Sequence, residues 1–302
     1  MAQRSTDGEE PVYLTTHELA DYLRIKERRI YELLRQRAIP ATRVTGKWLF
    51  PKAEIDRWLG AQEIEGIGGG HSLAPPIVAG SSDPLLDWAV RESNCGLAIQ
   101  AGGSEDGLAR MEAGAAQAAG LHLLDSESGE YNRSLVQARL SKLPLILIEW
   151  AKRRQGLVVA AGNPKKIAGI GDLARRDVKV VRRPSGAGSQ HLLDQLLAKE
   201  GVAPAGYRDS AVAQGETDLG LAILDGAADT GLAVEAVARA LKLDFVPLTE
   251  ERYDLLIERR AFFEPPLQRL FAFARTAAFA TRAKALGGYD LAHFGTVHYN
   301  GP

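Results

Sequence analysis

From Ile77 onward, short apolar runs rich in β-branched residues alternate with segments that carry a helical apolar stripe. The run at 77–80 precedes a helical pattern at 83–93, and the run at 96–100 precedes another at 104–117. This alternation is typical of parallel β-sheets with helices on both faces. We therefore predict an α/β fold for the larger part of the chain. Further strands are expected at 120–124, 145–150, 157–161, 178–181, 230–234 and 244–248.

Four of the predicted turns that lead into helices are built from small residues that carry hydroxyl groups. They lie at 80–83, 102–104, 185–189 and 216–218. A single turn of this kind is an ordinary helix cap. Several helix N-termini at one edge of a sheet, however, would direct N–H and O–H donors toward one point, where a negative charge is favoured. The recurrence therefore predicts a receptor for a small anion, made of neutral donors.

The glycine pattern of the turn at 185–189 argues against a nucleotide phosphate as that anion. Gly188 is not followed by the Lys-Ser/Thr pair of a P-loop, and Gly186 and Gly188 lack the third glycine of a dinucleotide-binding turn. Arg182 and Arg183 precede the turn and could add positive potential at the edge of the anion site. Adjacent surface arginines are more often solvated, and solvation is the expectation for this pair. A smaller anion remains the prediction.

The first sixty residues differ from the rest of the chain in charge. Between Val12 and Gly60 there are ten Lys and Arg against six Asp and Glu, whereas the whole chain has a formal net charge of −1. The pattern predicts one helix capped by Thr15 or Thr16, a second from about 26 to 36, a hairpin turning at Gly46, and a third helix from 53 to 59. A basic module of this form is typical of DNA-binding proteins.

This stretch resembles the excisionase-type winged helix-turn-helix. The resemblance lies in T-x-x-E-L-A-x-Y-L at 15–23, R-x-I-Y-x-L at 28–33, A-I-P-A-x-R-V at 38–44 and G-K-W-L-F-P at 46–51, and it covers Leu14 to Leu59. It implies that residues of the second helix approach bases and that the wing contacts the DNA backbone. The DNA-binding candidates, from that resemblance and from the basic faces of the helix and wing, are Lys26, Arg28, Arg29, Arg35, Arg43, Thr45 and Lys47.

A glycine-rich stretch at 66–70 followed by Pro75-Pro76 separates the basic module from the α/β part. We therefore expect a winged helix-turn-helix domain at 1–60, a linker at 61–75 and a ligand-sensing domain at 76–302.

The α/β part resembles the periplasmic-binding-protein-like domain of the molybdate/tungstate type. The matching motifs occur in order at 80–89, 102–108, 118–125, 147–164, 183–189, 231–248 and 287–290. The resemblance implies a type 2 fold with two α/β lobes, lobe one at 76–152 and 250–302 and lobe two at 153–249, and an anion held between them. The ligand-binding residues that it implies are Ser81, Ser82, Gly103, Ser104, Ser185, Gly186, Ala187, Gly188, Ser189, Thr217, Asp218 and Val234.

One position departs from the transport proteins of this type. They often have a tyrosine near the last of these turns, whereas this chain has Val234-Glu235. A carboxylate facing an oxyanion would repel it, so either Glu235 points away or the ligand is not a dianion.

Several kinds of site and location are not expected. The single cysteine, Cys95, excludes an internal disulfide framework and a cysteine-rich zinc site, and the six histidines show no i, i+4 pairing. No apolar run is long enough to span a bilayer, and we expect a cytoplasmic protein. We expect no catalytic residue, no metal site and no cofactor, so the chain is not predicted to be an enzyme.

Together these features predict a bacterial one-component transcription regulator. The winged helix-turn-helix would bind a double-stranded DNA operator, as a homodimer or higher homo-oligomer. The two-lobed domain would sense a small oxyanion, with molybdate or tungstate as the first candidates. A regulator that senses a small organic anion is the alternative, and an enzyme on the same scaffold is a third.

Overall fold

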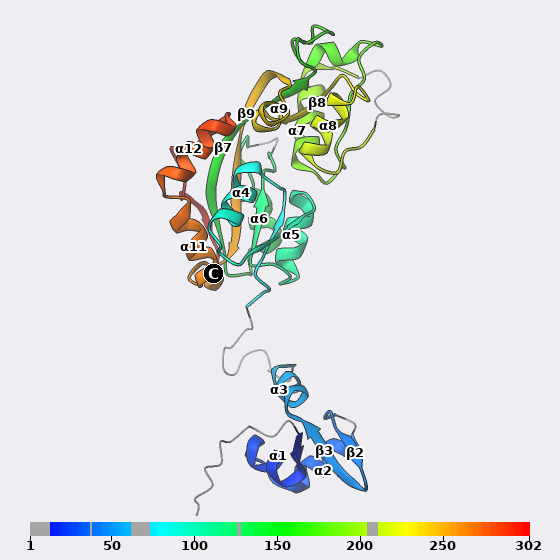
Figure 1. Cartoon of the computed structure of the whole chain (residues 1–302), viewed down its shortest axis with the longest axis vertical. Helices are drawn as coiled ribbons and strands as arrows, with labels where there is room; N and C mark the ends of the chain where they lie inside the picture. Colours follow the sequence, from blue (N-terminus) through cyan, green and yellow to red (C-terminus); the bar gives the residue numbers. More distant parts are fainter. Residues whose placement is uncertain (1–12, 37, 62–72, 126–127, 204–210) are drawn as a thin grey trace, which may run out of the picture. The chain divides into compact units, whose positions relative to one another are not determined.

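The structure is a computed structural model that describes residues 13–36, 38–61, 73–125, 128–203 and 211–302. It divides into two compact units, 1–71 and 72–302 (Figure 1). Each unit has its own hydrophobic core, and each is described by itself.

Unit 1 is a three-helix module with a small antiparallel sheet. Its elements are β1 (Tyr13–Thr15), α1 (Thr16–Leu23), α2 (Glu27–Arg35), β2 (Thr42–Val44), β3 (Lys47–Pro51) and α3 (Lys52–Ala61). Thr15 and Glu18 form the predicted capping box of α1, and Arg24 ends that helix in the left-handed conformation. Ile30, Phe50 and Ile55 are fully buried and join the helices to the sheet. The predicted helices and hairpin are confirmed, and β1, which pairs with β3, was not anticipated.

Unit 2 contains an eight-stranded mixed sheet. The strands are β4 (Ile77–Gly80), β5 (Ala98–Ala101), β6 (Ala118–Leu121), β7 (Leu145–Val159), β8 (Thr230–Val234), β9 (Asp244–Glu258), β10 (Tyr289–Asp290) and β11 (Val297–Asn300). They follow the order β10-β7-β9-β6-β4-β5, and β8 and β11 also pair with β7. β4 is parallel to β5 and β6, whereas the β6–β9, β7–β9 and β7–β8 pairs are antiparallel.

The helices of unit 2 cover this sheet in two groups. α4 (Pro84–Glu92), α5 (Ser104–Glu112), α6 (Arg133–Leu140), α10 (Arg259–Phe262), α11 (Pro265–Phe273) and α12 (Ala277–Leu286) belong to lobe one. The 3-10 helix η1 (Ile170–Ala174), α7 (Gly188–Glu200), α8 (Glu216–Leu224) and α9 (Glu235–Ala240) belong to lobe two. Figure 1 shows β7 and β9 running from one group of helices to the other.

The mixed sheet corrects three of the strand predictions. The sheet is not all parallel, because the two longest strands run antiparallel to their neighbours. The runs at 145–150 and 157–161 are one continuous strand, β7, because the polar residues between them include Arg153 and Gln155, which are buried and paired inside the unit. The run at 178–181 forms an isolated bridge to Thr230 and no strand of its own.

Candidate functional site

The turn between β4 and α4 carries Ser81, Ser82 and Asp83. Gly80 has a φ of +88°, and a Cβ at this position would lie 2.5 Å from the carbonyl oxygen of Gly120, so the turn requires glycine. Asp83 caps α4, since its Oδ1 accepts a hydrogen bond of 2.8 Å from the N–H of Leu86. The turn therefore holds Ser81 at the carboxyl end of a parallel strand.

His122, which follows β6, connects Ser81 to the crossing strands. Its Nε2 lies 2.8 Å from Ser81 Oγ, and its Nδ1 lies 2.8 Å from Glu251 Oε2. The Ser104 hydroxyl accepts a hydrogen bond of 3.2 Å from the N–H of His122. His122 is 2% exposed, so Ser81, Ser104 and Glu251 surround a buried imidazole. Sequence reasoning missed this residue because it lies 41 positions from Ser81 and 129 from Glu251.

Arg153 on β7 is the centre of a buried ion-pair cluster. It stands directly opposite Glu251 on β9 and forms an ion pair with it, and its Nη1 lies 3.0 Å from Asp83 Oδ2. Its guanidinium also lies 4.2 Å from the ring centre of Tyr253. Burial lowers the pKa of Arg153, but the charges of Glu251 and Asp83 outweigh that effect and raise it above its ordinary value. Burial likewise raises the pKa of Glu251, but Arg153 and His122 together bring it down to about 2.

The N-termini of α5 and α7 meet in unit 2. The carbonyl oxygen of Gly186 accepts a long hydrogen bond of 3.5 Å from the N–H of Glu105, and a Cβ on Gly103 would lie 3.1 Å from that same oxygen. A Cβ on Gly188 would lie 2.7–2.9 Å from three ring atoms of His122. The imidazole of His122 therefore packs against the first residue of α7, and the structure brings together six of the predicted residues, Ser81, Gly103, Ser104, Gly186, Ala187 and Gly188.

The other predicted ligand residues lie in different surroundings. Ser185 is exposed and Ser189 is 2% exposed in the first turn of α7. The N–H of Val234 donates to Glu216 Oε2 at 3.0 Å, and Asp218 Oδ2 accepts from the N–H of Gly215 at 2.8 Å, so both of these groups already have partners inside lobe two.

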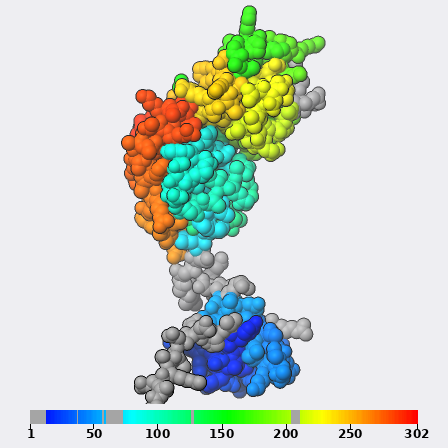
Figure 2. Space-filling view, in the orientation of Figure 1, coloured from blue at the N-terminus to red at the C-terminus, as the bar shows by residue number. Residues whose placement is uncertain are grey.

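Ser82 and Thr217 line a pocket of about 220 Å³ between lobe one and lobe two. Figure 2 shows the yellow surface of α8 and α9 beside the cyan and red surfaces of α4 and α12, the helices that contribute to the pocket. Burial raises the pKa of Asp87 in this pocket to about 6, and the nearby charge of Asp83 adds to the effect. The remaining lining residues are Pro84, Arg91, Glu216, Ala236, Val237, Ala240, Leu241, Arg282 and Leu286.

The structure gives the surroundings of two charged residues near the predicted ligand residues, Glu235 and Arg183. Glu235 forms ion pairs of 2.8 Å with Arg154 and with Arg239, so its charge is neutralised within lobe two. Arg183 was expected to be solvated, and that expectation is wrong, because it is 9% exposed. Its Nε and Nη1 have no hydrogen-bond partner among the described residues.

A cluster of possible metal ligands lies apart from this site. Ligand atoms of Glu149, Asp254 and His298 lie within 4.8 Å of one another. His298 Nε2 is 2.7 Å from Glu149, and Asp254 accepts hydrogen bonds from Asn132 and Arg252. These contacts pair several of the cluster's polar atoms with one another or with neighbouring residues, whereas Glu149 Oε1 is buried without a hydrogen-bond partner in the described part of the chain.

The candidate DNA interface of unit 1 lies on α2 and the β2–β3 hairpin. All seven predicted DNA-binding residues are exposed, and they are Lys26, Arg28, Arg29, Arg35, Arg43, Thr45 and Lys47. Thr45 and Gly46 both have positive φ, as a tight two-residue hairpin turn requires. The turn therefore places Arg43 and Lys47 on either side of the tip.

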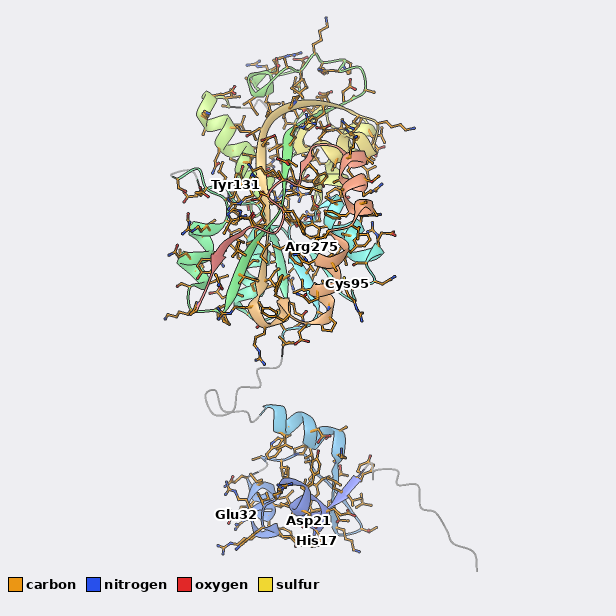
Figure 3. The ribbon with its side chains drawn as sticks, turned by 90° about the vertical axis from the view of Figure 1, so that its left-hand side faces the viewer. His17, Asp21, Glu32, Cys95, Tyr131 and Arg275 are labelled. Atoms are coloured by element: carbon orange, nitrogen blue, oxygen red, sulfur yellow. The ribbon has the colours of Figure 1, made fainter. Side chains whose placement is uncertain are left out.

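Glu32 is a feature of this interface that sequence reasoning did not weigh. Figure 3 labels Glu32 in unit 1. Its carboxylate lies 2.8 Å from Arg29 and 3.5 Å from Arg28 on the same helix. The hydrogen bond from Arg29 lowers the pKa of Glu32, which is therefore negatively charged at neutral pH. Arg28 and Arg29, two of the DNA-binding candidates on α2, are thus paired with an acid in the absence of DNA.

None of the helices in the described part of the chain is long and apolar enough to cross a bilayer.

Comparison with known proteins identifies both parts of the chain. The sequence model of the PBP superfamily domain matches residues 87–275, and that of a helix-turn-helix domain matches residues 13–63. The Bacillus subtilis (strain 168) protein "Uncharacterized protein YvgK" is 28% identical over 308 residues, which span 94% of this chain and 96% of that protein.

The solved structures that match this chain include two proteins of ABC transport systems. One is the tungstate ABC transporter from Geobacter sulfurreducens, with a TM-score of 0.47 and 15% identity, covering 69% of this chain and 97% of that chain. The other is an ABC-type phosphate transport receptor from Vibrio cholerae, with a TM-score of 0.46 and 14% identity, covering 70% of this chain and 98% of that chain.

A helix-turn-helix domain joined to a binding-protein-like domain is the organisation of a DNA-binding regulator with a ligand-binding domain. The chain belongs to the family defined by the PBP superfamily domain, and it carries a helix-turn-helix domain on the amino-terminal side of that domain.

Proposed function

We propose that this protein is a transcription regulator that senses a small oxyanion, with molybdate and tungstate as the first candidates. The helix-turn-helix unit would bind an operator, and unit 2 would bind the anion between its lobes. A symmetric dimer on paired half-sites is the usual arrangement for such DNA-binding modules. The regulator itself would then need no metal and no cofactor.

The observation that carries the proposal is the meeting of the α5 and α7 N-termini beside Ser81. Gly103 and Gly186 belong to different lobes, and their main chains approach closely enough that a Cβ on Gly103 would lie 3.1 Å from the Gly186 oxygen. Helix N-termini favour negative charge. An anion that contacts both would be held by donors from both lobes.

About six hydrogen bonds to the anion would suffice for a sensor. A hydrogen bond to a charged group contributes roughly 1.5–3 kcal/mol. About six such bonds, less an association cost of roughly 4–15 kcal/mol, are compatible with micromolar or tighter binding. A ligand that contacts both lobes stabilises their closed arrangement through contacts that the open arrangement lacks, and this difference is what a switch requires.

Isothermal titration of the full chain with molybdate, tungstate and sulfate tests the ligand. We expect binding of molybdate or tungstate with a lower dissociation constant than sulfate. Absence of heat with all three anions would contradict the oxyanion assignment and leave the DNA-binding unit untouched.

An organic anion is the second candidate ligand, and the pocket beside Ser82 and Thr217 favours it. Apolar side chains of α9 and α12 line that pocket together with two cations, Arg91 and Arg282, and two acids, Asp87 and Glu216. The cations and the apolar side chains suit a carboxylate with an apolar group. Titration with small carboxylates such as pyruvate and oxalate distinguishes this ligand class from the metal oxyanions.

The contact chain from Ser81 through His122 to Glu251 motivates a second candidate function, an ester hydrolase. A serine, a histidine and a carboxylate at 2.8 Å spacings resemble a nucleophile, a general base and the group that orients it. In this reaction Ser81 Oγ would bond to the ester carbonyl carbon, His122 would carry the hydroxyl proton to the departing alcohol, and water would then release the acid.

Two observations make the hydrolase the weaker candidate. The ion pair with Arg153 compensates the charge of Glu251, which reduces its ability to stabilise a protonated histidine, and Ser81 is 8% exposed. Labelling of the full chain with a fluorophosphonate tests this function. Labelling that Ser81→Ala abolishes would support a hydrolase, and absence of labelling would reject it.

A further inference from the structure

The Arg183 guanidinium lies inside lobe two without an acceptor. The residue is 9% exposed, and its Nε and Nη1 atoms are buried with no hydrogen-bond partner in the described part of the chain. A buried charge without a partner is strongly unfavourable. Buried charges in proteins are therefore usually paired with an opposite charge, from the protein or from a ligand.

The neighbouring acids do not supply that acceptor. Glu216 and Asp218 act on Arg183 through their charge, but no hydrogen bond from Arg183 to either is formed. Their carboxylates accept hydrogen bonds from the N–H groups of Val234 and Gly215 instead. Burial lowers the pKa of Arg183 and outweighs these two charges, which is the signature of a guanidinium that lacks a close partner.

Arg183 also lies beside the first turns of α7 and α8. It follows the bridge between Val180 and Thr230, and its N–H donates to Gln190 Oε1 in the first turn of α7 at 2.9 Å. Its Nη1 is 3.8 Å from the position that a Cβ of Gly215, the N-cap of α8, would occupy. The guanidinium therefore lies beside the N-terminus of α8, where the helix dipole makes a cation less favourable and an anion more favourable.

We propose that Arg183 is the cationic contact of the ligand in lobe two, and that the ligand is an anion with at least two oxygen acceptors, bound between this guanidinium and the N-terminus of α8. The planar fork of a guanidinium binds two oxygens of one oxyanion or carboxylate together. This inference rests on the proposed sensing function and adds a cationic contact to the neutral donors that the sequence predicted.

The substitution Arg183→Met tests the proposal, with Arg182→Met as the matched control. Methionine retains a long side chain and removes the charge. We expect the dissociation constant for the anion bound by the wild-type chain to rise at least about thirtyfold in Arg183→Met. Arg182→Met is expected to bind within threefold of the wild type, and Arg183→Lys, which keeps the charge and loses the fork, is expected to lie between the two.

The unfolding of the ligand-free variants provides a second, independent readout. Because Arg183 is a buried charge without a partner, the urea midpoint of ligand-free Arg183→Met should equal or exceed that of the wild type. A variant that binds the anion as tightly as wild type, or that unfolds at a much lower urea concentration, would overturn the proposal and assign Arg183 a structural role.

The two proposals fail in distinguishable ways. If the wild-type chain binds none of molybdate, tungstate, sulfate, phosphate, pyruvate and oxalate, the sensing function fails. If the wild type binds one of them and Arg183→Met binds it equally well, the sensing function stands and the role of Arg183 fails. The anion that binds also decides between a metal oxyanion and a carboxylate.

Discussion

Arg153 and Arg183 are both buried arginines of unit 2, and they differ in what surrounds them. Arg153 lies on a crossing strand between two buried carboxylates, those of Asp83 and Glu251. Arg183 follows a strand-like segment of lobe two, and its Nε and Nη1 lack partners in the described part of the chain. The difference teaches that burial alone does not assign a role to a charged residue. The charge of Arg153 is compensated by two carboxylates, although its Nε also lacks a hydrogen-bond partner in the described part of the chain, whereas Arg183 has no ion-pair partner there.

The largest expected change in stability comes from replacing Arg153, the arginine that has ion-pair partners. Arg153→Met leaves Asp83 and Glu251 buried without their cation, and we expect the free energy of unfolding to fall by about 3–5 kcal/mol. Urea unfolding at neutral pH measures the change. Equal losses from Arg153→Met and Arg183→Met would remove the distinction between the two arginines.

Gly188→Ala perturbs the place where the two lobes touch. The new Cβ would lie 2.7–2.9 Å from three atoms of the His122 ring, which is itself fixed by Glu251 and Ser81. We expect a loss of about 1–3 kcal/mol in the free energy of unfolding, because the ring must shift.

Gly186→Ala is the matched control for this substitution. Its Cβ would lie 3.6 Å from the Cβ of Glu105, which is an ordinary contact, so we expect a change within about 0.5 kcal/mol. A loss at Gly186 as large as that at Gly188 would show that the turn, and not the His122 contact, limits stability.

Asp87→Asn extends the comparison to a half-buried carboxylate, for which the loss of water outweighs the nearby charge of Arg91. Its folded-state pKa of about 6 exceeds the ordinary value of 3.8, so the protonated form favours folding and stability is lost as the pH rises from about 4 through 6. Asparagine does not ionise, so the variant does not lose stability over this pH range. We expect it to be more stable than wild type by about 1–3 kcal/mol at pH 8 and equal to it near pH 4, as measured by thermal unfolding across pH.

Glu32→Gln tests an ion pair that is exposed. Arg28 and Arg29 already contact solvent, so freeing them from Glu32 should change stability little and raise affinity for duplex DNA about two- to fivefold. Fluorescence anisotropy with a labelled duplex at fixed salt measures the change. Glu54→Gln, an exposed acid in the first turn of α3, removes the same charge elsewhere, and an equal gain from it would reduce the effect to net charge.

The sequence predicted the architecture well, because local patterns determine it. Thr15 and Glu18 form a capping-box pattern that predicts the start of α1. The turns after β4 and before α7 are recognisable in the sequence as small residues that follow apolar runs. The strand β7 was missed as a single element because Arg153 and Gln155 read as solvent-exposed residues. Their burial depends on Glu251, almost a hundred positions away in the chain.

The site was predicted less completely than the fold. The turns that meet were identified from their glycines and serines, but the histidine between them was not. His122 follows an apolar strand without any motif around it, and its partners come from three separate segments. Arg183 carried no signal that distinguishes it from Arg182, because burial is a property of packing that neither residue's neighbours in sequence reveal.

The β7–β9 pair links lobe one to lobe two. Its register shifts between Glu149 and Ala151 and again between Gln155 and Gly156, on either side of Arg153. Such irregularities bend and twist a ribbon locally while its remaining hydrogen bonds persist. A reorientation of the lobes would therefore be concentrated in the segment of β7 between the two register shifts. No strand would have to separate and re-form, so the change would reverse when the anion departs.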